Sequence, residues 1–230
     1  EYPLDMSMRI SHEAIYRYIY VLPRGTLKKT LIEGLRQERA YRRKQSKLEN
    51  TKENRGKISN MLSIEERPKE VEDRSVPGHW EGDLIVGKYH RSALGTLVER
   101  TTRYTILVPL TGKDAESVRK AYVHEFKTIP KEIAKTLTYD QGKEMSEHKQ
   151  FTIDTGIQVY FAHPGSPWER GTNENTNGLI RQYFPKGNEF DKVSGREIKR
   201  VQRQLNDRPR AVLGYLKPDE VINSLVALKV

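Results

Sequence analysis

The chain has 230 residues, enough for one ordinary domain with a smaller appendage or for one large domain with a proper core. Its 41 Lys and Arg against 31 Asp and Glu leave a formal charge of +10, which favours a polyanionic partner such as nucleic acid. The lack of cysteine excludes disulfide frameworks, thiolate zinc sites and thiol nucleophiles. No apolar run approaches the roughly 18 to 20 residues that span a bilayer, so a cytoplasmic protein without a membrane partner is expected. Because the first residue is Glu1 rather than Met, the chain is expected to be a piece of a longer protein.

The first predicted element is a helix that Ser11 caps. An apolar series with four-residue and three-residue spacing predicts its buried face: Ile15, Ile19 and Leu22. Pro23 and Gly25 end the helix, and Tyr16 and Arg17 lie on its other face. Residues 1–35 therefore form either part of a helix-turn-helix that reads DNA or an ordinary amphipathic packing element. The sequence leaves both interpretations open.

A strongly basic segment comes next. Residues 28–57 contain eleven Lys and Arg and four Glu, with almost no large apolar residue beyond Leu35. Such a segment cannot form a core of its own, so residues 36–75 are predicted to be a partly helical linker. Its cations, among them Arg42, Arg43 and Lys44, are candidates for contacts with a phosphate backbone. The alternative is a charge run that is merely solvated.

The composition changes after Pro77, where strand-like apolar runs begin. Three runs joined by short polar turns predict an antiparallel meander: Trp80–Val86, Leu94–Val98 and Tyr104–Leu110. A helix, a strand, a helix and a fifth strand follow at Asp114–Phe126, Thr136–Tyr139, Glu147–Thr155 and Ile157–Phe161. Further helices are predicted over about 173–182, over 194–205 and from 218 onward. This order predicts an α/β fold over 76–230, a mixed five-stranded sheet flanked by helices.

Three carboxylates occupy unusual places in these elements. Asp83 lies in the middle of an apolar strand, where a carboxylate needs a partner. Asp140 ends a strand and precedes the turn Gln141–Gly142, and ligand sites of open α/β sheets tend to lie at such ends. Glu174 falls in the first turn of a helix, after a loop rich in Gly and Pro. Each has an ordinary structural explanation when taken alone.

Together, Asp83, Asp140 and Glu174 fit phosphoryl transfer with two metal ions, which needs carboxylates from separate elements. Hard oxygen ligands select Mg²⁺ or Mn²⁺. Any chain with 31 acidic residues offers some such triple by chance, so the specificity comes from the placement in the predicted elements.

Five segments carry a resemblance to a known family: Gly78–Gly87, Leu97–Arg100, Tyr139–Gly142, Trp168–Gly178 and Asn206–Arg210. They resemble the IS-thirty family of bacterial insertion-sequence transposases and, more loosely, the integrase core of retroviral enzymes. The match covers about residues 76–225. The short interval of 33 residues between Asp140 and Glu174 is also similar to these families.

The resemblance implies a ribonuclease-H-like fold and a bacterial, nucleoid-associated enzyme with Asp83, Asp140 and Glu174 as its catalytic and metal-binding residues. The implied activity is cleavage of DNA 3′ ends and strand transfer of an insertion sequence, by a homodimer or higher assembly. A nuclease that cuts without joining and a non-catalytic DNA-binding module remain the alternatives.

Several side chains near this triad are candidates for DNA contact. Arg181 lies two helical turns after Glu174, on nearly the same predicted face, with Asn177 between them. Arg170 and Lys186 flank this helix and are further candidates. Four other conspicuous side chains are predicted to be structural: Trp80 and Trp168 by packing, His79 and His163 by satisfied hydrogen bonds. The alternatives are stacking of a tryptophan on an extruded base, and a contact of either histidine with DNA or with the ligands of the site.

Overall fold

The computed structural model describes residues 10–35 and 58–227. Two compact units divide the chain, one covering Glu1–Thr51 and the other Lys52–Val230. Within the described ranges, no helix has both the length and the apolar character needed to cross a membrane.

The first unit contains the helices α1 (His12–Val21) and α2 (Thr26–Glu33). The predicted cap is confirmed, because the Ser11 hydroxyl accepts a hydrogen bond from the Ala14 N–H at 3.1 Å. The predicted apolar face is buried only in part, with Ile19 at 5% exposure and Ile15 at 43%. Lys28 ties the helices together by donating to the Leu22 carbonyl at 2.7 Å. The helix-turn-helix interpretation stays a prediction, and the basic residues Arg42, Arg43 and Lys44 lie outside the described residues.

The second unit is built on a mixed six-stranded sheet with the order β1-β6-β5-β2-β3-β4. Its strands are β1 (Leu62–Ser63), β2 (His79–Val86), β3 (Ala93–Glu99), β4 (Thr105–Pro109), β5 (Thr136–Tyr139) and β6 (Gln158–Phe161). The strands β2, β3 and β4 form the predicted antiparallel meander, whereas β5, β6 and β1 continue the sheet in parallel. The α/β class and the mixed sheet are thus confirmed.

The edge strand β1 is an addition to the five strands expected from the sequence. It pairs Leu62 with Tyr160 and Ser63 with Phe161 of β6. Residues 58–75, predicted as the end of a linker, also contain short 3₁₀ helices at Ile64–Glu66 and Lys69–Val71. A strand of two residues has no alternating pattern, so periodicity gives no signal for it.

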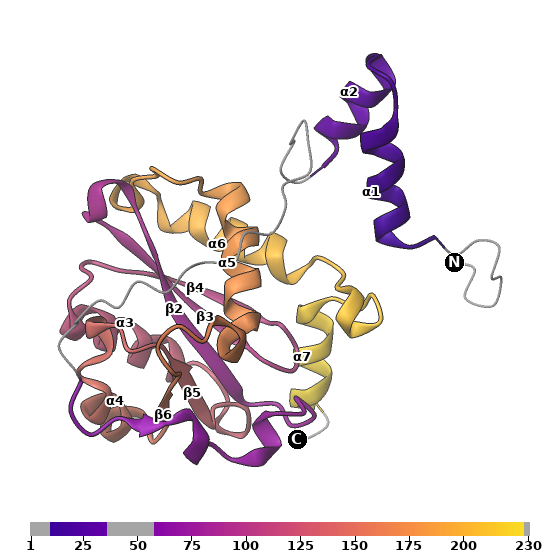
Figure 1. Ribbon diagram of the computed structural model, residues 1–230. Helices are drawn as coiled ribbons and strands as arrows, with labels where there is room; N and C mark the ends of the chain where they lie inside the picture. The colour runs from indigo at the N-terminus through magenta and orange to yellow at the C-terminus, as the bar shows by residue number, and fades with distance from the viewer. Residues whose placement is uncertain (1–9, 36–57, 228–230) are drawn as a thin grey trace. The chain divides into compact units, whose positions relative to one another are not determined.

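Helices cover both faces of this sheet: α3 (Ala115–Phe126), α4 (His148–Thr155), α5 (Gly171–Tyr183) and α6 (Gly195–Asn206). The helix α7 (Pro218–Ala227) follows them in the chain. Figure 1 shows α3 and α4 together on one side, with α5 and α6 on the other. Each side has its own apolar core, one around Trp80, Tyr122 and Phe151 and one around Ile180 and Leu205. The two cores fix the helices against the sheet, so residues on β2, β5 and α5 keep definite positions.

Candidate active site

The parallel pairing of β2 with β5 brings Asp83 and Asp140 to neighbouring positions. Glu81 of β2 lies opposite Thr138 of β5, and the two aspartates come two residues later on each strand. Residues two apart on a strand share a face, so this register predicts that both carboxylates project from the same side of the sheet. A shared contact with Arg170 confirms that they do.

Arg170 lies between the two aspartates. Its Nη2 is 3.3 Å from Asp140 Oδ2, and its Nη1 is 3.8 Å from Asp83 Oδ1. The same Nη1 donates to the Gly82 carbonyl at 3.1 Å, which fixes the guanidinium against β2. Arg170 is only 9% exposed, so its guanidinium is held in place beside the Asp83 and Asp140 carboxylates.

Glu174 is exposed on the first turn of α5, and Asn173 anchors that turn to the sheet. The Asn173 N–H donates to Glu81 Oε2 at 2.8 Å, and its Nδ2 donates to the Glu81 carbonyl at 2.9 Å. Its Oδ1 accepts from the Thr96 hydroxyl at 3.1 Å. Because Asn173 is completely buried, these bonds hold the backbone next to Glu174 at a fixed place beside β2 and β3.

The pKa of Asp83 reflects the charges and the burial around it. Burial raises the pKa of this carboxyl to about 6, against the attraction of the Arg170 guanidinium. The negative charges of Asp140 and Glu174 raise the pKa further, so both carboxylates are within electrostatic reach of Asp83. An additional positive charge at this position would relieve the repulsion.

Two further residues of α5 follow Glu174 along β2. Asn177 Nδ2 donates to Asp83 Oδ2 at 2.8 Å. Arg181 Nη2 donates to the Val86 carbonyl at 2.8 Å, and Nη1 donates to the Pro185 carbonyl at 3.4 Å. Arg181 is half-buried, and burial lowers the pKa of its guanidinium.

Several known proteins are similar in sequence to this chain over most of its length. A family model for the integrase core domain matches residues 73–167. The transposase for insertion sequence element IS1086 of Cupriavidus metallidurans is 44% identical over 98% of this chain and 66% of its own length. The transposase InsI for insertion sequence element IS30A of Escherichia coli is 44% identical over 98% of this chain and 59% of its own. Integrase ORF3 of Spiroplasma virus SpV1-R8A2 B is 31% identical over 91% of this chain and 67% of its own.

The chain belongs to the IS30 family of transposases. The resemblance seen in the sequence motifs is therefore confirmed. The chain spans 66% and 59% of the length of the first two transposases, so it corresponds to a part of each.

Structural comparison confirms the ribonuclease-H-like fold of this IS30-family chain. The catalytic core domain of BIV integrase aligns with a TM-score of 0.52 at 15% sequence identity, over 66% of this chain and 97% of the integrase core. At that identity the likeness establishes the architecture alone.

Two acidic residues of the site were missed in the sequence. Glu144, four residues after Asp140, has its pKa raised by burial and then by the charges of Asp140 and Asp83, so it is a fourth carboxylate within electrostatic reach of the pair. Glu81 is completely buried and forms an ion pair with Arg100 besides its bonds to Asn173. In the sequence, the only indication was that Glu81 lies two residues before Asp83 and Glu144 four residues after Asp140. Contacts with residues from other elements leave no local sequence pattern, so the roles of these two glutamates could not be predicted.

The predictions for the tryptophans and histidines have mixed outcomes. Trp80 is completely buried and donates to the Ile133 carbonyl at 2.7 Å, which confirms a packing role. The same prediction is wrong for Trp168, which is 73% exposed. His79 is a satisfied structural histidine, bonded to Thr136 Oγ1 and Glu70 Oε1. His163 bonds Glu169 at 2.9 Å from an exposed position.

The side chains around Asp83 are suited to a hard cation. The carboxylates of Asp83, Asp140, Glu174 and Glu144 offer oxygen donors only, which favour Mg²⁺ or Mn²⁺ over softer metals. The contacts of Arg170 show that the space beside both aspartates accepts positive charge. Within the described ranges, no three His, Asp or Glu side chains are yet as close together as one metal ion requires.

Proposed function

We propose that this chain cleaves DNA 3′ ends and joins them to target DNA as a metal-dependent transposase, with Asp83, Asp140 and Glu174 as the catalytic carboxylates. The observation that carries the proposal is the convergence of Asp83 and Asp140 on one buried cation, beside a helix that holds Glu174 at a fixed place. The names of the family members, transposases for insertion sequence elements, support the reaction class.

The carboxylates of Asp83, Asp140 and Glu174 would hold Mg²⁺ or Mn²⁺, with two ions in the complete site. When bound, these ions supply Lewis-acid stabilisation of the charge that develops on the phosphate oxygens. Asn177 orients Asp83 by donating to Oδ2, which leaves Oδ1 directed toward Arg170. Arg170 neutralises part of the carboxylate charge and keeps the two aspartates from separating.

The proposed partner is DNA, as insertion-sequence ends and as target, bound by a homodimer or higher assembly at the bacterial nucleoid. The formal charge of +10 supports a polyanionic partner. The proposed DNA contacts are Arg181, Asn177, Arg170 and Lys186 near the site, together with Arg42, Arg43 and Lys44. Lys186 is exposed and accessible to a phosphate.

The experiment is a cleavage and strand-transfer assay on labelled duplexes that carry the ends of the insertion sequence encoding this chain. The parent chain should nick at the 3′ end and form joined product when Mg²⁺ is present, and Asp140→Asn should lose both activities. Nicking without joined product would identify a nuclease. Binding without either product, under Mg²⁺ and Mn²⁺ alike, would leave a DNA-binding module.

A second readout does not depend on activity. Mg²⁺ should raise the melting temperature of the parent with increasing concentration, because an ion that binds only the folded chain stabilises it by linkage. Glu174→Gln should reduce this rise, whereas the same change at the exposed Glu132, on a different element, should leave it intact. An equal rise in both variants would contradict the role of Glu174 as a ligand.

A further inference from the structure

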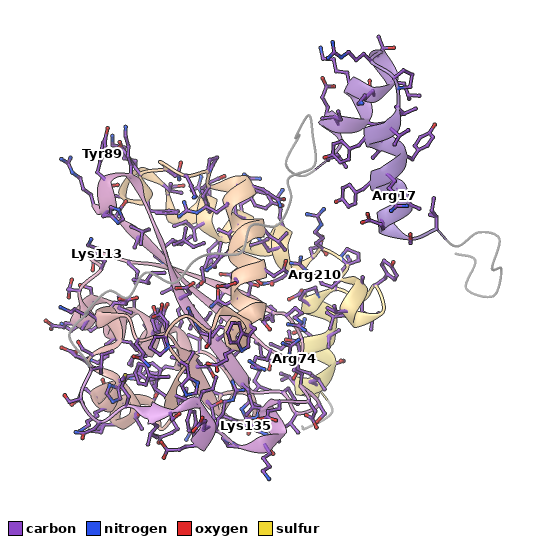
Figure 2. The ribbon with its side chains drawn as sticks, viewed as in Figure 1. Arg17, Arg74, Tyr89, Lys113, Lys135 and Arg210 are labelled. Atoms are coloured by element: carbon purple, nitrogen blue, oxygen red, sulfur yellow. The ribbon has the colours of Figure 1, made fainter. Side chains whose placement is uncertain are left out.

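The tip of the β2–β3 hairpin, Lys88–Arg91, presents an aromatic ring close to two cations. All four residues are exposed, and Tyr89 is 74% exposed. Figure 2 shows Tyr89 at the outer end of the hairpin. Lys88 Nζ lies 5.1 Å and Arg91 Cζ 5.8 Å from the centre of the Tyr89 ring. The tip therefore offers an exposed aromatic ring with two cations close to it.

The backbone of the hairpin tip is strained. Tyr89 has φ 52° and ψ 22°, and His90 has φ 56°, so two residues with bulky side chains adopt the left-handed conformation. Such a conformation is unfavourable for residues other than glycine. Burial of the Tyr89 ring does not offset this cost, because the ring is exposed. Strain without compensation from packing is typical of sites that bind a partner.

The hairpin tip is nevertheless held firmly at its base. The Gly87 N–H donates to the Ser92 carbonyl at 2.8 Å, and the Lys88 N–H donates to the Asn188 carbonyl at 2.8 Å. A Cβ at Gly87 would lie 2.8 Å from the Asn188 carbonyl oxygen, so only glycine allows this close approach. The tip is thus fixed against the turn 185–188, and Tyr89 is presented without a further ordering cost.

Positive charge extends from the hairpin tip onto this turn and beyond. Lys186 is exposed on the turn, and Lys192 is exposed nearby. The acidic residues of this area are Glu189, which pairs with Lys88 at 3.5 Å and with Lys192, and the exposed Asp191. The cations of the tip and the turn outnumber these two carboxylates.

The hairpin tip lies at a useful distance from the catalytic carboxylates. Val86 is three residues beyond Asp83 on β2, or about 10 Å at the usual rise of a strand, and the tip extends further. Successive base pairs of DNA are about 3.4 Å apart. A duplex that has its scissile phosphate at Asp83 and runs along β2 therefore passes the tip a few base pairs away.

We infer that the hairpin tip and the turn 185–188 together bind double-stranded DNA next to the scissile phosphate. Lys88, Arg91 and Lys186 contact phosphates, and Tyr89 packs against the sugar and base edges between them. Duplex DNA matches this surface because its phosphates, which attract the cations, are regularly spaced. The sugars and base edges between the phosphates offer an apolar surface to the Tyr89 ring. The inference rests on the proposed function, which brings DNA to Asp83, and it adds the surface that holds the flanking duplex.

The test measures binding of a labelled insertion-sequence-end duplex to the 230-residue chain carrying Asp140→Asn, by fluorescence anisotropy at several salt concentrations. Lys88→Ala with Arg91→Ala should weaken binding and reduce the salt slope by about 2, since each phosphate contact contributes about 0.9. Tyr89→Ala should weaken binding about tenfold at an unchanged slope, and Tyr89→Phe should retain it. Lys131→Ala with Lys149→Ala, which removes two exposed cations from other elements, is the matched control and should change neither quantity.

The outcomes separate the two proposals. Unchanged affinity in the Lys88 and Arg91 variant, or an equal loss in the control, would overturn the assignment of this surface. Circular dichroism melts of all variants exclude loss of the fold as the cause. Cleavage by the parent tests the proposed function independently. If binding is weakened by the hairpin-tip substitutions but the parent does not cleave DNA, only the proposed enzymatic function is refuted. If the parent cleaves DNA but the substitutions leave binding unchanged, only the proposed DNA-binding surface is refuted.

Discussion

Asp83 keeps a carboxylate in a place where burial opposes its charge. The protein compensates with a guanidinium, an amide and a backbone N–H, from Arg170, Asn177 and Leu84. The compensation is incomplete, because the pKa of Asp83 is still raised to about 6 from the ordinary 3.8. The charged carboxylate therefore bears an energetic cost, which protonation or an added positive charge would remove.

That cost predicts a pH-dependent effect of Asp83→Asn in the absence of divalent metal. The folded state holds the Asp83 proton more tightly than the unfolded state, so its stabilising contribution is full below pH 3.8 and is lost as the pH rises through about 6. Asp83→Asn should thus gain stability relative to the parent across this window, by a free energy of unfolding on the order of 3 kcal/mol at most. Urea melts at pH 4.5 and 7.5 measure the gain. Parallel pH dependence in parent and variant would contradict the raised pKa, and the exposed Asp191→Asn serves as control.

At the scale of elements, the first turn of α5 connects the sheet with Glu174. Asn173→Ala removes the side-chain bonds to the Glu81 carbonyl and the Thr96 hydroxyl and leaves buried polar groups unsatisfied. We expect a loss of about 2 to 3 kcal/mol in the free energy of unfolding. Cleavage should fall further than the folded fraction explains, since Glu174 loses its fixed place. The exposed Asn175→Ala, two residues away on the same helix, should change little, and an equal loss in both variants would show that these bonds do not hold the helix.

The end of α5 gives a second prediction at this scale. Arg181→Ala removes the hydrogen bonds to the Val86 and Pro185 carbonyls, so the free energy of unfolding should fall by about 1 kcal/mol. Cleavage should fall more than stability, because Arg181 also lies on the helix face that follows the proposed catalytic carboxylates along β2. Arg181→Lys should retain more activity than Arg181→Ala. Full cleavage activity in Arg181→Ala would restrict this residue to a structural role, with the exposed Arg196→Ala as control.

Elements with a strong period were predictable from the sequence. The bounds of β5 agree with the prediction, and α3 and α6 begin after the caps Asp114 and Ser194. In each case the signal is local, because alternation, helical spacing and capping are written in neighbouring residues. The two-residue β1 depends on pairing with β6, almost a hundred residues later, and so it has no local signal.

The same contrast holds for the candidate site. Asp83 and Asp140 were found because a carboxylate in or at the end of an apolar strand is visible in the sequence alone. The position of Arg170 between them was not, since it depends on how the loop after β6 returns to β2. The exposure of Trp168 has the same origin, because no periodic pattern governs a loop of Gly and Pro.

At the scale of the whole molecule, the excess of positive charge is concentrated in part of the sequence. Residues 28–57 hold eleven of the 41 Lys and Arg, most of them in the first compact unit, whereas the proposed catalytic carboxylates all lie in the second. This separation suggests that affinity and chemistry are divided between the two units. The proposal that the basic run binds phosphates is independent of the active site and is open to its own measurement.

Arg42→Ala, Arg43→Ala and Lys44→Ala, combined in the 230-residue chain, should weaken DNA binding and reduce its dependence on salt. If each cation binds one phosphate, the slope of log affinity against log salt should fall by about 0.9 for each, or by nearly 3 in total. Affinity for unrelated duplexes should fall as much as affinity for insertion-sequence ends, because phosphate contacts do not read the base sequence. With saturating DNA, the rate of cleavage should stay near that of the parent, since none of these residues belongs to the unit that contains Asp83. An unchanged slope would mean that the basic run is only solvated, and a fall in the cleavage rate at saturation would mean that it takes part in arranging the DNA for the reaction.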